Sequence, residues 1–362
     1  MRRVRRLKTG GVVVGRMAKG CRLCILGAKM VLFITGLCDL NCYYCPISYK
    51  RRGKDLIYAD EVLVEKDEDI IREAKLIRAL GTGITGGEPL MVPERVLYYI
   101  NLLKEVFGKK HHIHLYTYGR NLDESLMGKL AEAGLDEIRF HLVRDKDREK
   151  VRLAVNYGVS TGVEMPAIPG SEKRLIEIAS FLEKVGGAFL NLNEMEITES
   201  NMYELYKRGF KLKRGGIVEV EGSEETALKV IEWAAKNLER VSVYYCPALL
   251  KDNVQMRNRW KRRARSVAKP YEYVTERGTL LKGVICGENI TLSKLKEVKE
   301  ILTNEFNLPS ELIYIDNSKL RLETRVDVVD ELKGFLKKKG LKVALVEESP
   351  TDGRLELTFI PL

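Results

Sequence analysis

The sequence of 362 residues predicts an α/β fold followed by a smaller α+β module. Between residues 29 and 246, short runs rich in β-forming residues alternate with longer amphipathic segments, a pattern typical of βα units around a parallel sheet. From residue 275 the order of the runs changes to strand, helix, strand, strand, helix, strand, strand. The chain is also long enough for one large core and a smaller partner domain.

The first part is expected to hold six strands, each next to a helix. The expected strands are residues 30–35, 83–85, 113–117, 137–142, 159–165 and 188–193. The expected helices are residues 67–79, 93–107, 122–133, 146–157 and 171–185. Because the carboxyl ends of parallel strands meet at one edge, polar residues that follow these strands are candidates for a functional site.

The second part is expected to begin near residue 275. Its strands are predicted at residues 280–286, 312–315, 320–324, 342–346 and 355–360, and its helices at 295–306 and 326–338. This order resembles a ferredoxin-like α+β module. Such a fold by itself does not specify a function.

Two motifs in the first part carry chemistry. The first strand is followed by three cysteines with the spacing C-x3-C-x2-C, which are Cys38, Cys42 and Cys45. A four-iron cluster held by three thiolates keeps one iron open, although three such cysteines also fit an incomplete zinc site or buried apolar side chains. The second strand is followed by a glycine pair, which lets a backbone approach a ligand, and a carboxylate, which can accept from an ammonium. These residues are Gly86, Gly87, Glu88 and Pro89.

Together the two motifs resemble the radical S-adenosylmethionine (radical SAM) superfamily, over residues 20–250. The resemblance implies a partial (β/α)6 barrel in which Cys38, Cys42 and Cys45 bind a [4Fe-4S] cluster and SAM chelates its open iron. It implies that Tyr44 lies near the adenine and that the glycine motif grips the methionine ammonium. A reductant protein such as ferredoxin or flavodoxin would supply the electron.

The third strand ends in a segment similar to the T-N-G segment that contacts the SAM ribose in related enzymes. Thr117 and Gly119 match this segment, and Tyr118 stands where the relatives usually have asparagine. With the resemblance, the chain divides into four expected parts. These are a basic N-terminal extension with C-x2-C (1–28), a radical SAM partial barrel (29–250), a basic helical linker (251–274) and a ferredoxin-like domain (275–362).

Later strand ends offer candidate catalytic residues, namely Glu164, Asn193 and Glu194. Strand alternation allows Glu164 to look into the barrel mouth. Asn193 and Glu194 could equally cap the following turn. His141 is expected to be a structural histidine with satisfied hydrogen bonds, and the remaining three histidines are expected at the surface. Those three are His111, His112 and His114.

Three further cysteines suggest a second metal site. Cys21 and Cys24 form a C-x2-C pair before the first strand, and Cys246 ends a later apolar run. If that run returns beside the first strand, Cys246 could complete a three-cysteine set for a second iron–sulfur cluster or zinc. Without such a site, Cys21 and Cys24 would be an incidental or redox-labile pair.

The net charge of +11 is concentrated in two segments. Residues 1–22 carry eight Lys or Arg and no acid, and residues 250–270 carry eight against Asp252 alone. Localised cations attract polyanions, and Trp260 within the second segment could stack on a base. RNA is therefore one possible partner, and a solvated connector helix is the other interpretation of the second segment.

Composition favours a cytoplasmic enzyme. No apolar run approaches the roughly 18 residues that span a bilayer, and the N-terminus lacks the apolar region of a signal peptide. Clustered cysteines indicate metal ligands in a reducing compartment rather than disulfides. Many Lys, Arg and Glu residues with the single glutamine Gln255 indicate a thermophilic source.

The resemblance implies an enzyme that cleaves SAM reductively and generates a 5′-deoxyadenosyl radical. The two basic segments and the added module favour modification of an RNA, most simply a transfer RNA. Activation or modification of a protein or peptide is the alternative favoured by a distant resemblance to the activating enzymes of pyruvate formate-lyase. Cofactor biosynthesis is a third possibility. A non-catalytic iron–sulfur or zinc protein that binds nucleic acid is the interpretation from a different class.

Overall fold

The computed structural model describes all 362 residues and divides into two compact units, Met1–Met256 and Arg257–Leu362. The predicted fold class is confirmed, with a parallel α/β partial barrel in the first unit and a ferredoxin-like module in the second. The predicted linker at residues 251–274 is split: a π-helical turn, η3 (Lys251–Met256), belongs to the first unit and the basic helix α9 (Arg257–Val267) to the second. None of the helices is both long and apolar enough to cross a membrane.

The first unit is built on an 11-stranded sheet in the order β1-β2-β11-β10-β9-β8-β7-β6-β3-β4-β5. Strands from β11 through β3 in this order run parallel. Their bounds are β3 (Lys29–Phe33), β6 (Gly81–Thr85), β7 (His112–Thr117), β8 (Glu137–Phe140), β9 (Ser160–Pro166), β10 (Phe189–Asn193) and β11 (Ser242–Cys246). The prediction of six parallel strands therefore missed one, β11.

The barrel does not close, because β11 and β3 do not pair with each other. β2 (Val12–Val14) pairs antiparallel with β11 and carries β1 (Val4–Arg6) outside it. On the other edge, β4 (Tyr58–Ala59) pairs antiparallel with β3 and carries β5 (Val62–Leu63). The expected return of the last strand beside the first is thus replaced by a short hairpin at each edge, which covers backbone groups that would otherwise be free to pair.

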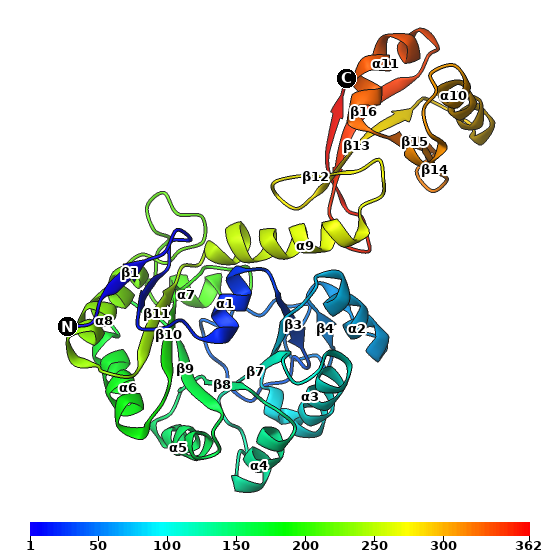
Figure 1. The fold of residues 1–362 in the computed structure, drawn as a ribbon. Helices are drawn as coiled ribbons and strands as arrows, with labels where there is room; N and C mark the ends of the chain where they lie inside the picture. The colour runs from blue at the N-terminus through cyan, green and yellow to red at the C-terminus, as the bar shows by residue number, and fades with distance from the viewer. The chain divides into compact units, whose positions relative to one another are not determined.

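Helices cover the outer face of this sheet (Figure 1). They are α2 (Asp67–Leu76), α3 (Pro93–Phe107), α4 (Glu124–Glu132), α5 (Arg148–Asn156), α6 (Glu172–Val185) and α8 (Ser223–Asn237), and a short α7 (Met202–Lys207) follows β10. The outward residues of the strands are apolar: on β7, Ile113 and Leu115 belong to the main core. Alternation along a strand then sends His112, His114 and Tyr116 to the inner face.

The inner face is covered by α1 (Lys19–Ile25), which contacts β3, β6 and β7 and lies within the ring of strands in Figure 1. Gly20 of α1 lies so close to His114 that a Cβ atom would stand 2.8 Å from the ring carbon Cε1. The surface position expected for His111, His112 and His114 is wrong, and all three are buried. His112 and His114 are buried because the inner face of β7, which would be open to solvent in a simple sheet, is covered by the N-terminal helix. His111 is buried instead against Phe107 of α3 and Thr82 of β6.

The second unit contains a six-stranded antiparallel sheet in the order β14-β15-β13-β16-β17, with β12 paired to β13. Its strands are β12 (Tyr273–Val274), β13 (Leu280–Cys286), β14 (Tyr314–Asp316), β15 (Arg321–Thr324), β16 (Lys342–Glu348) and β17 (Glu356–Pro361). The helices α10 (Leu292–Asn304) and α11 (Val326–Lys338) contribute to a separate apolar core.

Candidate active site

A cavity of about 500 Å³ opens at the carboxyl ends of the parallel strands. Its walls include the residues at or just after the ends of β6, β7, β8, β9 and β10, which are Thr85, Thr117, His141, Pro166 and Asn193. Most of the predicted site residues line this one cavity. They are Cys38, Cys42, Tyr44, Cys45, Gly86, Gly87, Glu88, Pro89, Thr117, Glu164, Asn193 and Glu194. Four predicted residues do not line it: Gly119, Cys21, Cys24 and Cys246.

The three cysteines of the first motif lie in the loop that follows β3. The loop closes on itself, because Gly36 N donates to Lys54 O (2.8 Å) and Gly53 N donates to Gly36 O (2.8 Å). Burial raises the pKa of the Cys38 and Cys42 thiols. Binding of a metal by these thiols would release protons, because the thiolate is the ligand.

An interaction missed by the sequence reasoning fixes this loop to the end of β7. The Asp39 carboxylate accepts a hydrogen bond from Tyr118 Oη (2.5 Å) and pairs with Arg120. The Tyr118 hydroxyl and the neighbouring guanidinium hold the pKa of Asp39 below its usual value. Tyr118, which replaces the asparagine of the T-N-G pattern, thus joins the cysteine loop to the end of β7.

The glycine pair lies against the start of the cysteine loop. A Cβ atom on Gly86 would be 2.5 Å from Thr35 O, and one on Gly87 would be 2.3 Å from Leu37 O. Gly87 N donates to Thr35 O (2.8 Å), and Glu88 N donates to Leu37 O (2.7 Å). Only glycine allows the two backbone segments to lie this close. The cysteine motif and the glycine motif, which are distant in the sequence, therefore form one hydrogen-bonded unit.

Glu88 connects the ends of β6 and β7. Its carboxylate accepts from Leu90 N (3.0 Å), Tyr118 N (2.9 Å) and the Thr117 hydroxyl. Burial raises its pKa to about 7, and the hydrogen bonds oppose this rise only in part. The Thr117 hydroxyl also accepts from Gly119 N (2.8 Å), which explains how Gly119 supports the site without lining the cavity.

A charged network forms the inner wall of the cavity around Glu164. The Glu164 carboxylate accepts from Arg139 Nη1 (2.8 Å), Asn191 Nδ2 (2.9 Å) and Asn193 Nδ2 (2.9 Å). Burial opposes ionisation, but Arg139 and the two amides hold its pKa below the usual value. Arg139 was not among the predicted site residues, although an arginine at an inward position of β8 was a detectable signal.

The remaining predicted residues are held by hydrogen bonds. Tyr44 Oη lies 2.9 Å from His141 Nε2, whose other nitrogen lies 3.2 Å from Glu164 O. His141 is therefore satisfied, as expected. Glu194 accepts from Ala248 N (2.9 Å), and burial raises its pKa. This hydrogen bond joins the end of β10 to the segment after β11, which agrees with a structural role for Glu194.

The second cysteine set is brought together through α1. Cys21 and Cys24 lie one helical turn apart, and Cys21 packs with Cys246 at the end of β11 in a small cluster that includes Tyr244. Asn191 Nδ2 donates to the Cys21 thiol (3.3 Å), and burial raises the pKa of Cys21 to about 11. A metal at these cysteines stays a prediction.

The chain is similar to several known proteins. A protein of Methanocaldococcus jannaschii, which carries the provisional name glycyl-radical enzyme activating enzyme, is 40% identical over 361 residues, covering 96% of this chain and 93% of the relative. The structure of Streptococcus suis SuiB gives a TM-score of 0.46 at 13% identity over 69% of this chain and 54% of SuiB. Methylornithine synthase gives 0.40 at 12% identity over 56% and 62%.

The sequence pattern of the radical SAM superfamily matches residues 32–182, which contain both motifs. The residues present fit a cluster and SAM, because the three thiols and the glycine turn border the same cavity. This match and the full-length relative place the chain in the radical SAM superfamily, as an enzyme that uses a [4Fe-4S] cluster and S-adenosylmethionine.

Proposed function

We propose that this radical SAM enzyme acts on a protein, as an activating enzyme that generates a glycyl radical in a partner. The observation that carries the proposal is the 40% identity with a relative of that name across nearly the whole of both chains. Because the similarity includes 96% of this chain, it extends beyond the cofactor motifs to the second unit.

In this proposal Cys38, Cys42 and Cys45 ligate the cluster, which when bound supplies the electron that cleaves SAM. A ferredoxin or flavodoxin would reduce it. The chain supplies the placement: the Gly86-Gly87 turn and Glu88 hold the cysteine loop against β6 and β7. Glu164 and Asn193 present fixed polar groups to a substrate in the same cavity.

The contacts of the basic segments weaken the argument for RNA. Arg263 of α9 is only 2% exposed, and its guanidinium binds Pro350 O (2.8 Å) and Asp352 (2.6 Å) within the second unit. In the N-terminal segment, Arg2 donates to Val241 O (2.5 Å) and Arg5 to Gly15 O (2.6 Å). Several of these cations thus serve intramolecular contacts, and the comparisons favour a protein substrate over RNA.

The test is to mix the reconstituted, dithionite-reduced enzyme and SAM anaerobically with soluble protein from the source organism. We expect a SAM-dependent glycyl-radical EPR doublet and 5′-deoxyadenosine in similar amount. When the soluble protein comes from cells grown on α-deuterated glycine, the 5′-deoxyadenosine should contain deuterium, because the radical abstracts the glycine α-hydrogen. The Cys42→Ala variant is the control without radical. Formation of 5′-deoxyadenosine only when RNA is added, with no protein radical, would contradict the proposal.

A glycine variant tests whether the joined motifs set the cofactor geometry. Gly87→Ala places a methyl group 2.3 Å from Leu37 O, next to Cys38, so the cysteine loop must shift. A shift of the loop by about 1 Å can lower activity about 100-fold. The rate of 5′-deoxyadenosine release measures this activity. The matched control is Gly334→Ala in α11, where a Cβ atom meets nothing within 4 Å. Equal rates in the two variants would refute the steric argument.

A further inference from the structure

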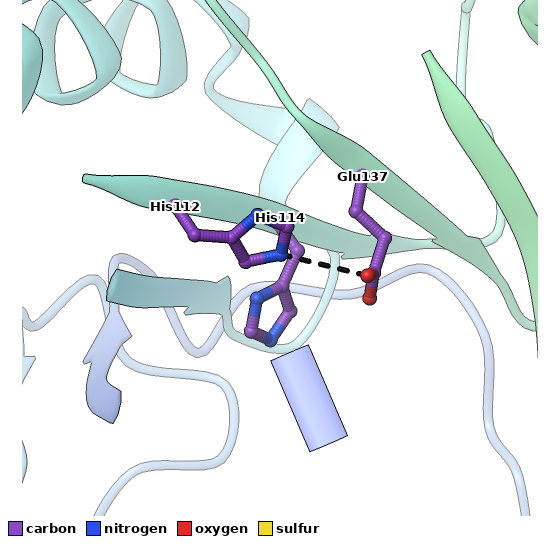
Figure 2. A group of neighbouring side chains, drawn as sticks. All are labelled: His112, His114 and Glu137. Atoms are coloured by element: carbon purple, nitrogen blue, oxygen red, sulfur yellow. Dashed lines mark ion pairs between the residues drawn. The ribbon is translucent and has the colours of Figure 1, made fainter. Parts of the chain in front are cut away.

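Three buried side chains gather on the inner face of the sheet, away from the cavity that contains the cysteine loop. His112 and His114 of β7 and Glu137 of β8 have donor atoms that all lie within 4.8 Å of one another (Figure 2). Their residues are 3%, 0% and 1% exposed. The register explains the grouping, because His112 and His114 are two apart on one strand and His114 pairs with Glu137 on the next.

The two imidazoles are the unusual part of this group. Neither Nδ1 nor Nε2 of His112 or His114 forms a hydrogen bond of good geometry, and the nearest approach is a long contact between His112 Nε2 and Glu137 Oε2 (3.5 Å). A buried polar atom without a partner costs about 1–3 kcal/mol, and four lie together here. The other two histidines of the chain are satisfied, since His111 Nε2 lies 2.9 Å from the Thr82 hydroxyl and His141 contacts Tyr44. The unsatisfied nitrogens are therefore particular to this group.

Glu137 is already oriented toward the imidazoles. Its Oε1 accepts from Arg139 Nε (2.6 Å), while Oε2 lies 3.5 Å from His112 Nε2, the pair joined by the dashed line in Figure 2. Oε2 also accepts a long hydrogen bond from Gly20 N (3.4 Å). One oxygen is thus anchored by a cation and the other faces the histidines, which is how outer contacts orient a metal-binding carboxylate.

The group has access to solvent from the amino ends of the strands. A cavity of about 370 Å³ there is lined by His112 and Glu137, with Asp136, Ser160 and Ser242 also in its wall. The Asp136 carboxylate lies 3.9 Å from His112 Nδ1. This cavity could admit an ion and leave room for water at an open coordination position.

We propose that His112, His114 and Glu137 form a binding site for one divalent transition-metal ion of the zinc class. Two imidazoles and one carboxylate form a donor set that Zn²⁺ uses when a fourth position stays open. The ion would be ligated by one nitrogen of each imidazole, atoms that form no hydrogen bond within the chain. Around the site, Arg139 lies between two carboxylates, Glu137 and Glu164, and Asp136 adds a third near His112. The wall of the cavity also holds the cations Arg16, Lys19 and Arg22.

The test uses the full-length enzyme with its iron–sulfur sites loaded, equilibrated with Zn²⁺ and then freed of unbound metal. Zinc per chain is counted beside iron and sulfide. We expect about one zinc more in the wild type than in the His112→Gln/His114→Gln variant. His111→Gln is the matched control, because it changes the adjacent buried histidine outside the group and should keep the zinc. Equal zinc in the wild type and the double variant would overturn the site.

Two further measurements keep the proposal testable if the double variant folds poorly. Zn²⁺ should raise the Tm of the chelator-treated wild type, as expected for a ligand that binds only the folded chain. Co²⁺ added to a variant in which Cys21, Cys24, Cys38, Cys42, Cys45 and Cys246 are all replaced by Ala should give ligand-field bands that the further His112→Gln/His114→Gln change removes. No zinc retained by the wild type, or cobalt bands that persist without the two histidines, would reject the site.

Discussion

At the scale of single residues, Glu88 shows how a motif residue acts through its neighbours. Sequence reasoning assigned its carboxylate to a ligand ammonium, whereas the structure shows it accepting hydrogen bonds from Leu90, Thr117 and Tyr118. The residue is 1% exposed, so its charge depends on these three donors. This arrangement makes Glu88 a positioning residue for the ends of β6 and β7 that border the cavity.

The raised pKa of Glu88 predicts a pH dependence of stability. With a folded pKa of about 7 against 4.5 unfolded, the folded chain holds the proton more tightly, so this contribution is complete below pH 4.5 and lost as the pH rises through 7. Glu88→Gln cannot titrate. We expect the stability of the variant relative to wild type to rise by about 2–3 kcal/mol between pH 4 and pH 8, measured by urea unfolding. A difference that stays constant with pH would contradict the shift.

At the scale of elements, the N-terminal helix α1 is decisive. It covers the inner face of β7 and carries Cys21 to the end of β11, where Cys246 lies, while Cys24 follows one helical turn later. The predicted three-cysteine site depended on the last strand returning beside the first. The structure brings Cys21 and Cys246 together in another way, with a helix inside an open sheet.

Metal analysis tests the second cysteine set. If it holds a cluster, reconstituted wild type should contain about eight irons, and the Cys38/Cys42/Cys45→Ala variant about four. The Cys21/Cys24/Cys246→Ala variant should also keep about four and still cleave SAM if the first cluster is intact. Iron and sulfide assays measure this. Zinc in the first variant that disappears when Cys21, Cys24 and Cys246 are also replaced would indicate a zinc site at these cysteines. Neither iron nor such zinc in the first variant would exclude both kinds of site.

At the scale of the whole molecule, the two units have separate apolar cores. The second unit contains a buried ionic cluster, in which Lys282 Nζ lies 2.7 Å from Glu323, 2.8 Å from Glu348 and 3.6 Å from Glu272. All four side chains are 3% exposed or less. Removing one member of such a cluster leaves buried charges without compensation.

We therefore expect Lys282→Ala to destabilise the second unit by about 3–5 kcal/mol. Calorimetry should show two transitions, of which only one moves, because the units need not unfold together. The iron content should not change. Lys294→Ala, which removes an exposed ion pair with Glu297, is the control and should cost no more than about 1 kcal/mol. A single transition that shifts as a whole would argue against independent units.

The sequence by itself determined the local features of this protein. Hydrophobic periodicity indicated the strands and helices of both units, with the helix at 326–338 and the strand at 280–286 matching α11 and β13 in full. Motif spacing indicated the superfamily, and the strand-end rule brought Glu164, Asn193 and the two motifs to one cavity. These features depend on residues close in the chain or on one general rule of parallel sheets.

Only the tertiary structure decided what covers the inner face of the sheet. The burial of His112 and His114 and the meeting of Cys21 with Cys246 depend on α1 entering the ring of strands. The contact of Arg139 with Glu164 depends on β8 and β9 lying side by side. A strand pattern states which residues share a face, but burial of that face is set by contacts between segments far apart in the chain. That is why polar residues expected at the surface form the interior of this barrel.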